Sequence, residues 1–100
     1  MVNEKAEALK AEGDKLFDEK NYSEARKQYK KAKNLDPSVP DYFYGLAHCY
    51  MKMSDYVSCQ EAAQECIEAD SSFIGGYILL ARACIKNLSL IHISEPTRPY

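Results

Sequence analysis

Apolar and small residues recur every three or four positions over most of the first 87 residues, which is the spacing of one face of an α-helix. Five such stretches follow one another, so the pattern predicts five helices and no strand. The apolar and small positions are Ala6, Leu9, Gly13, Leu16 and Phe17 in the first stretch; Tyr22, Ala25, Tyr29, Ala32 and Leu35 in the second; Phe43, Leu46, Ala47 and Tyr50 in the third; Tyr56, Cys59, Ala63, Cys66 and Ile67 in the fourth; and Tyr77, Leu80, Ala81 and Cys84 in the fifth.

Polar residues and prolines mark where these helices begin and end. Asn21 followed by Glu24 has the layout of a capping box and predicts the start of the second helix. Pro37 ends that helix, because proline cannot donate the helical hydrogen bond. The other predicted starts are Pro40 in the first turn of the third helix, Asp55 as the cap of the fourth, and Ser71 or Ser72 as the cap of the fifth.

A longer regularity joins the five stretches, because residues of similar size recur about every 34 positions. Leu9, Phe43 and Tyr77 are related in this way. The small residues Gly13, Ala47 and Ala81, and the pairs Asn21-Tyr22 and Asp55-Tyr56, follow the same spacing. An ordinary helical bundle or a coiled coil is the alternative, and neither requires such a period.

On these residues the chain resembles the tetratricopeptide repeat family from about Ala6 to Asn87. The resemblance implies an all-α solenoid of helical hairpins, with two full repeats (about 6–39 and 40–73) and the first helix of a third (74–87). About five antiparallel helices are expected, in which the small residues let paired helices approach closely.

The last thirteen residues, 88–100, break the repeat where Asn87 is expected to open a turn, and they contain two prolines. Their sequence resembles a translated sequencing adapter, so we expect an artefactual or disordered tail; a genuine strand or tail is the alternative. A repeat array normally ends in a polar capping helix. Residues 1–87 are therefore expected to be marginally stable or to self-associate through the uncapped fifth helix.

The resemblance also implies a function, because first helices of such repeats line a concave groove that holds a peptide or a partner helix. The expected groove residues are Lys10, Asp14 and Phe17 from the first repeat, Tyr44, His48 and Met51 from the second, and Ile78 and Arg82 from the third. Tyr44 and Arg82 are the expected anchors, since aromatic and guanidinium groups dominate protein interfaces. We expect an adaptor or scaffold module that is a fragment of a longer protein, and an enzyme or a J-domain elsewhere in that protein is a further alternative. The alternative is a structural segment that only stacks or self-associates.

The first repeat is similar to those of co-chaperones, which grip the terminal carboxylate of heat-shock chaperones with two lysines, two asparagines and an arginine. Lys10 matches the first lysine, but Asp14 and Gly45 stand at the asparagine positions. Gly75 replaces the second lysine and Leu79 the arginine. A carboxylate needs several charged donors, so chaperone capture is a weaker alternative.

Charge and composition exclude other classes of function. Thirteen Lys and Arg against fifteen Asp and Glu give a net charge of −2, so neither nucleic acid nor an anionic membrane is the expected partner. No cofactor or metal is expected, the four cysteines contain no C-x-x-C pair, and the thiols suit the cytoplasm. No catalytic motif is present, so the chain is predicted not to be an enzyme.

The convex face is expected to be charged and solvated, with opposite signs on neighbouring helices that attract each other weakly. The basic residues are Arg26, Lys27, Lys30, Lys31 and Lys33, and the acidic residues are Glu61, Glu65, Glu68 and Asp70.

Overall fold

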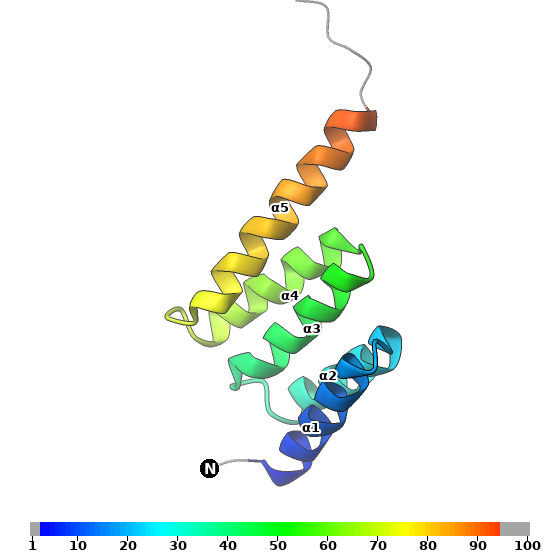
Figure 1. Cartoon of the computed structure of the whole chain (residues 1–100). Helices are drawn as coiled ribbons and strands as arrows, with labels where there is room; N and C mark the ends of the chain where they lie inside the picture. Colours follow the sequence, from blue (N-terminus) through cyan, green and yellow to red (C-terminus); the bar gives the residue numbers. More distant parts are fainter. Residues whose placement is uncertain (1–2, 95–100) are drawn as a thin grey trace, which may run out of the picture.

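The computed structural model describes residues 3–94, with side chains described as far as residue 88, and these residues form five helices (Figure 1). The helices are α1 (Glu4–Asp18), α2 (Tyr22–Leu35), α3 (Pro40–Lys52), α4 (Tyr56–Ala69) and α5 (Ile74–Ser94). Each helix packs against the next along the chain, and α3 also contacts α1 and α5. The predicted solenoid of antiparallel helices is confirmed. None of the described helices combines the length and hydropathy that a membrane crossing requires.

The helix starts agree only partly with the sequence analysis. Asp55 caps α4 as predicted, by accepting a hydrogen bond from the Ser58 amide at 3.3 Å. Pro40 stands in the first turn of α3, also as predicted. Asn21 lies at the capping position of α2, but its side chain makes no capping hydrogen bond, so the predicted capping box is wrong.

The start of α5 differs from the prediction, because neither Ser71 nor Ser72 caps it. The Asp70 carboxylate holds Ser72 instead, accepting from its amide at 3.0 Å and from its hydroxyl at 2.6 Å. The helix begins two positions later, at Ile74, where the Gly76 amide donates to the Phe73 carbonyl at 3.1 Å. Serine and aspartate readily form such short turns. This turn uses the Ser72 hydroxyl, which is the group that would otherwise cap the helix.

The turns inside the two hairpins are built alike. Lys20, between α1 and α2, has φ 64°, and Ser54, between α3 and α4, has φ 63°. Both residues adopt the left-handed backbone conformation, which costs about 1–2 kcal/mol for a residue with a Cβ atom. At the equivalent position after α5 stands Leu88, a strong helix former, and the helix runs through it to Ser94. The predicted end of the fifth helix at about Asn87 is therefore wrong; residues 95–100 of the expected tail lie outside the described residues.

The buried face of α5 also differs from the prediction. Within residues 74–88 of α5, Gly76, Leu79 and Ala83 are buried, Leu79 with 2% and Ala83 with 0% exposure, whereas Tyr77 is 46% exposed and Ala81 is exposed. Of the equivalents of Tyr77 in the first two repeats, Phe43 is buried and Leu9 is half-buried. They belong to hairpins that have a second helix, whereas α5 has only α4 and the edge of α3 to pack against. The repeat pattern identified the face of α5 that a sixth helix would cover.

Candidate functional site

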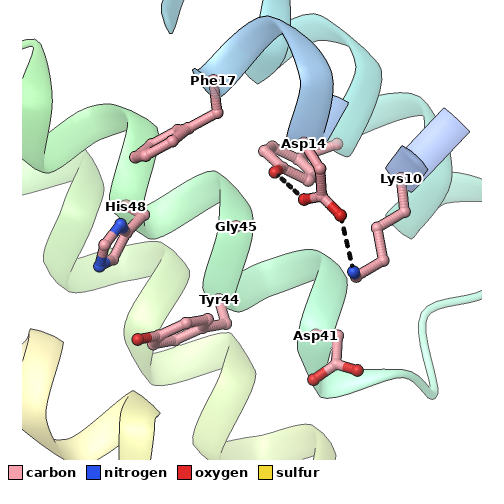
Figure 2. A pocket seen from close by; sticks show the side chains of 8 residues that line it. Lys10, Asp14, Phe17, Asp41, Tyr44, Gly45 and His48 are labelled. Atoms are coloured by element: carbon pink, nitrogen blue, oxygen red, sulfur yellow. Dashed lines mark hydrogen bonds and ion pairs between the residues drawn. The ribbon is translucent and has the colours of Figure 1, made fainter. Parts of the chain in front are cut away.

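A hollow of about 320 Å³ opens between α1 and α3, and we call it the α1–α3 hollow (Figure 2). Five of the eight predicted groove residues line it: Lys10, Asp14, Phe17, Tyr44 and His48. Phe17, His48 and Tyr44 lie on one side of the view in Figure 2, and the charged side chains lie on the other. The remaining lining residues are Tyr29, Asp41 and Gly45.

A second hollow, of about 390 Å³, lies between α3 and α5 and is called the α3–α5 hollow. It brings together the predicted residues Met51 and Arg82, with Ile85 and Lys86 beside them. The last predicted residue, Ile78, lines neither hollow and is 46% exposed on α5. We call the two hollows together the groove.

The ring of Tyr29 fills the floor of the α1–α3 hollow, because two glycines leave room for it. A Cβ atom on Gly13 would lie 3.0 Å from the ring, and one on Gly45 would lie only 2.7 Å from it. The sequence analysis placed Tyr29 in the core, and it is indeed 3% exposed. Its second role as groove floor was missed; the signal was a glycine in the middle of a helix, where glycine is otherwise destabilising.

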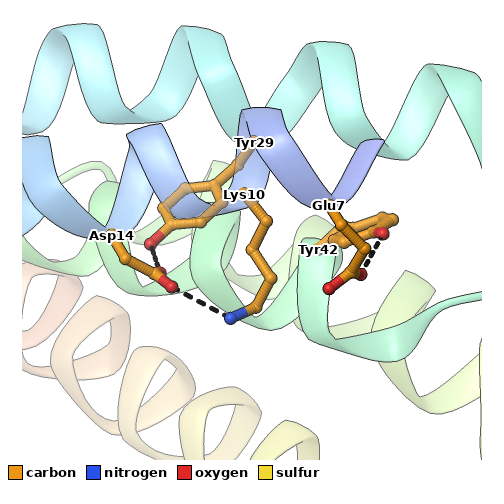
Figure 3. A network of polar contacts seen from close by, with 5 residues as sticks. All are labelled: Glu7, Lys10, Asp14, Tyr29 and Tyr42. Carbon is orange, nitrogen blue, oxygen red and sulfur yellow. Dashed lines mark hydrogen bonds and ion pairs between the residues drawn. The ribbon is translucent and has the colours of Figure 1, made fainter. Parts of the chain in front are cut away.

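Two buried tyrosines beneath the groove donate hydrogen bonds to carboxylates of α1 (Figure 3). The Tyr29 hydroxyl donates to Asp14, and the Tyr42 hydroxyl donates to Glu7. The Lys10 ammonium completes the first group by donating to the other oxygen of Asp14 at 2.9 Å. Burial, with the adjacent carboxylates, raises the pKa of both tyrosines. Both phenols therefore stay protonated and keep donating throughout the neutral range.

Lys10 is surrounded by negative charge. Its hydrogen bond to Asp14 raises its pKa, and the charges of Asp14, Asp41 and Glu7 act in the same direction. Three carboxylates thus face one ammonium at this end of the groove.

An aromatic row crosses the groove from α1 to the start of α5. The ring centroids are 5.4 Å apart for Phe17 and His48, 5.2 Å for His48 and Tyr44, and 5.3 Å for Tyr44 and Phe73. Gly75 lies against this row, because a Cβ atom there would be 2.7 Å from the Tyr44 ring. We call this row the aromatic shelf; its rings of Phe17, His48 and Tyr44 line the α1–α3 hollow.

His48, in the middle of the row, is neutral at neutral pH. Burial lowers its pKa, and the positive charges of Lys52 and Arg82 lower it further.

Of the residues at the chaperone-clamp positions, Lys10 alone carries a side-chain donor. Lys10 is bonded to Asp14, and Tyr29 takes the space beside Gly45. Leu79 is 2% exposed and cannot reach a ligand in the groove. The space that the Tyr29 and Tyr44 rings need beside Gly45 and Gly75, and the burial of Leu79, account for three of the departures from the clamp pattern.

The convex face contains one contact between the basic and acidic helices. The Lys33 ammonium lies 3.8 Å from Glu65 and 5.6 Å from the centre of the Phe43 ring. Arg26 departs from the expected solvated face: its Nε atom is buried and has no hydrogen-bond partner.

The cysteines have the environment of small core residues. Cys49, Cys59 and Cys66 are fully buried, and burial raises their pKa values to about 12, about 11 and about 11. At neutral pH they are thiols, which are poor nucleophiles and poor metal ligands. Within residues 3–88, no three His, Cys, Asp or Glu side chains gather closely enough to hold a metal ion.

Comparisons with known proteins agree with the fold. A family model described as "TPR repeat" matches residues 13–54. The small glutamine-rich tetratricopeptide repeat-containing protein 2 of Mycosarcoma maydis is 35% identical over 83 residues, which are 83% of this chain and 24% of that protein. Hsp70-Hsp90 organizing protein 3 of Arabidopsis thaliana is 35% identical over 72 residues, or 72% of this chain and 13% of that protein. The chain therefore spans a quarter or less of these two relatives.

Solved structures share the arrangement of helices. The first TPR of Spaghetti (RPAP3), bound to the HSP90 peptide SRMEEVD, superposes with a TM-score of 0.85 at 23% identity, covering 90% of this chain and 71% of that one. The TPR2AB domain of yeast Sti1, in complex with pHSP90, gives a TM-score of 0.82 at 26% identity, covering 85% of this chain and 33% of that one.

Proposed function

This chain belongs to the tetratricopeptide repeat family, and we propose that it is a protein-interaction module of the cytoplasm that binds an extended peptide or a helix of a partner protein in its groove. The observation that carries the proposal is the groove itself: both hollows lie along α3, the aromatic row lines the first of them, and charged side chains line each. Apolar concave surfaces with a few polar groups are the usual form of a binding site. The module binds and does not catalyse.

The proposal is tested by capture of partners with the wild-type chain and with the double variant Tyr44→Ala/Arg82→Ala. We expect the variant to lose the captured proteins, because it removes the centre of the shelf and a cation of the α3–α5 hollow. The matched control is Ser23→Ala/Lys31→Ala, at exposed positions of α2. Thermal melts of both variants confirm that they remain folded. Equal capture by all three proteins contradicts the groove assignment.

Chaperone capture is a second candidate, because relatives and solved structures with this fold carry HSP70 or HSP90 in their descriptions. The peptide SRMEEVD is the direct probe. We expect weak binding, since Asp14 repels a carboxylate and Lys10 is bonded to Asp14. Asp14→Asn removes the repulsion and frees Lys10, so it should tighten binding by roughly tenfold if this peptide uses the clamp positions. No change in Asp14→Asn excludes the clamp.

Self-association is a third candidate, and the outer surface of α5 favours it. Apolar side chains of α5 are exposed from its first turn to Leu88: Ile74 by 71%, Tyr77 and Ile78 by 46%, Ile85 by 65% and Leu88 by 63%. Light scattering of the purified chain at several concentrations is the measurement. A mass that rises with concentration, and that returns to the monomer value in Tyr77→Lys/Leu88→Lys, supports assembly through this surface; a constant monomer excludes it.

A further inference from the structure

The two ends of the groove carry unneutralised charge of opposite sign. At the first end, the carboxylates of Glu7, Asp14 and Asp41 face the single ammonium of Lys10. Lys10 pairs with Asp14, and no ion pair joins Asp41 to another of the described residues. Asp41 lines the α1–α3 hollow and is therefore a carboxylate available to a ligand.

The second end is positive. Arg82 and Lys86 line the α3–α5 hollow, and Lys52 and Arg82 both act on His48. No carboxylate lines this hollow, and none of these three cations forms an ion pair within the part of the chain that the structure describes. The guanidinium of Arg82 suits a carboxylate particularly well, because it offers paired donors in a planar fork.

The aromatic row, three of whose rings line the α1–α3 hollow, is uncharged at neutral pH. The rings of Phe17 and Tyr44 border the α1–α3 hollow together with Asp14 and Asp41. Aromatic faces beside carboxylates favour a cationic side chain, because ring and carboxylate both attract positive charge. The same surroundings repel an anion at that end.

Building on the proposed function, we infer that the groove selects a bipolar peptide segment, with a lysine or arginine that enters the α1–α3 hollow beside Asp41, an apolar residue on the aromatic row, and an aspartate or glutamate that pairs with Arg82 and Lys86. Charge complementarity of this kind contributes to specificity more than to raw affinity, since a segment with the wrong sign at either end meets repulsion.

The inference is tested by selecting a displayed library of random peptides on the wild-type chain and on two charge-reversed variants, Asp41→Lys and Arg82→Glu. We expect wild-type selection to enrich peptides that combine a basic and an acidic residue around an apolar one. Asp41→Lys should replace the basic residue by an acidic one, and Arg82→Glu should replace the acidic residue by a basic one. The best wild-type peptide, made synthetically, should lose about tenfold in affinity for either variant.

Controls separate this inference from the proposed function. Lys31→Glu and Glu61→Lys reverse charges on exposed convex positions and should leave the selected sequences unchanged. Asp41→Asn removes the charge with little change of shape. If the affinity for the selected peptide falls in Asp41→Asn as it does in Asp41→Lys, misfolding is excluded as the cause of the loss. If the enriched peptides depend on Arg82 but carry acidic residues at both ends, the inference is wrong and the groove assignment still holds. Selection that yields no peptide sensitive to Tyr44→Ala or Arg82→Ala overturns both.

Discussion

Tyr29 connects the core to the groove, and its position depends on what two neighbouring residues lack. Gly13 of α1 and Gly45 of α3 both lie against the same atoms of the Tyr29 ring, and neither carries a side chain. The ring can therefore lie deep enough to be buried while its hydroxyl still reaches Asp14. A single aromatic residue thus fixes both the packing of three helices and the orientation of a groove carboxylate.

We expect Gly45→Ala to lower the free energy of unfolding by about 1–3 kcal/mol, because its methyl group would lie 2.7 Å from the Tyr29 ring and force it to move. The sign is informative, since the same substitution at a helix position with free space stabilises by about 1 kcal/mol. Urea unfolding followed by circular dichroism measures the change. Ser23→Ala, at an exposed position of α2, is the control, and a more stable Gly45→Ala variant contradicts the packing described for Tyr29.

Lys10 and Asp14 line the α1–α3 hollow and Arg82 lines the α3–α5 hollow, because a helix of known register projects every third or fourth residue onto the same side. Their role in binding a partner stays a prediction. The bond from Tyr29 to Asp14 could not be predicted, since it joins residues on two helices whose separation is set by the glycines between them. Local pattern identifies a face, and only packing decides which polar groups meet on it.

At the level of the helices, the hairpin turns store backbone strain in a regular way. Lys20 and Ser54 both adopt left-handed backbone angles, although each has a Cβ atom. The turn amides still find partners: the Asn21 amide donates to Leu16 at 2.9 Å, and the Asp55 amide donates to Tyr50 at 2.9 Å. These hydrogen bonds hold each turn in the same shape despite different side chains.

Ser54→Gly should raise the free energy of unfolding by about 1 kcal/mol, because glycine adopts the left-handed conformation without the steric cost. Ser23→Gly is the matched control, since this exposed residue lies in the first turn of α2 and glycine there should lower stability by about 0.5 kcal/mol. Chemical unfolding of the two variants under identical conditions gives the comparison. Equal changes in the two variants would mean that the turn at Ser54 is not strained.

The helices themselves followed from the sequence, but their ends and the buried side of α5 did not. Periodic apolar residues predict a helix wherever they occur, whereas a cap depends on competing hydrogen bonds, as Ser72 and Asp70 demonstrate. The buried side of α5 depends on which neighbours are present. Leu79 is buried against the helices that contact α5. Tyr77 lies on the side of α5 that faces the second helix in the earlier hairpins, and it is exposed.

Over the whole molecule, ionisable groups in the core couple stability to alkaline pH. The pKa values of Cys49, Cys59 and Cys66 rise from 9.0 to between about 11 and about 12 in the folded chain. Burial excludes the thiolate, so the folded state favours the proton more than the unfolded state does. The stability that these thiols contribute is fully present below pH 9 and is lost as the pH rises through the folded values.

We therefore expect the free energy of unfolding to fall above pH 9, by about 1.4 kcal/mol per pH unit for each thiol that ionises only when unfolded. Urea unfolding in reducing buffers between about pH 8 and about pH 10.5 measures this slope. Cys59→Ala and Cys66→Ala are the test variants, because Ala25 and Ala32 occupy the equivalent positions of the first repeat. Each variant should have a shallower slope, and an unchanged slope contradicts the assignment to the thiols.

The left-handed turns at Lys20 and Ser54 have a consequence for how such a molecule could be lengthened. Leu88 stands where a third turn of this kind would fall, and the chain continues there as helix. Reversing direction at that point would bring a following segment back over Tyr77 and Ala81. In a longer array engineered from this chain, the backbone angle at position 88 therefore decides between another hairpin and a continued helix. Leu88→Gly is the first substitution to make.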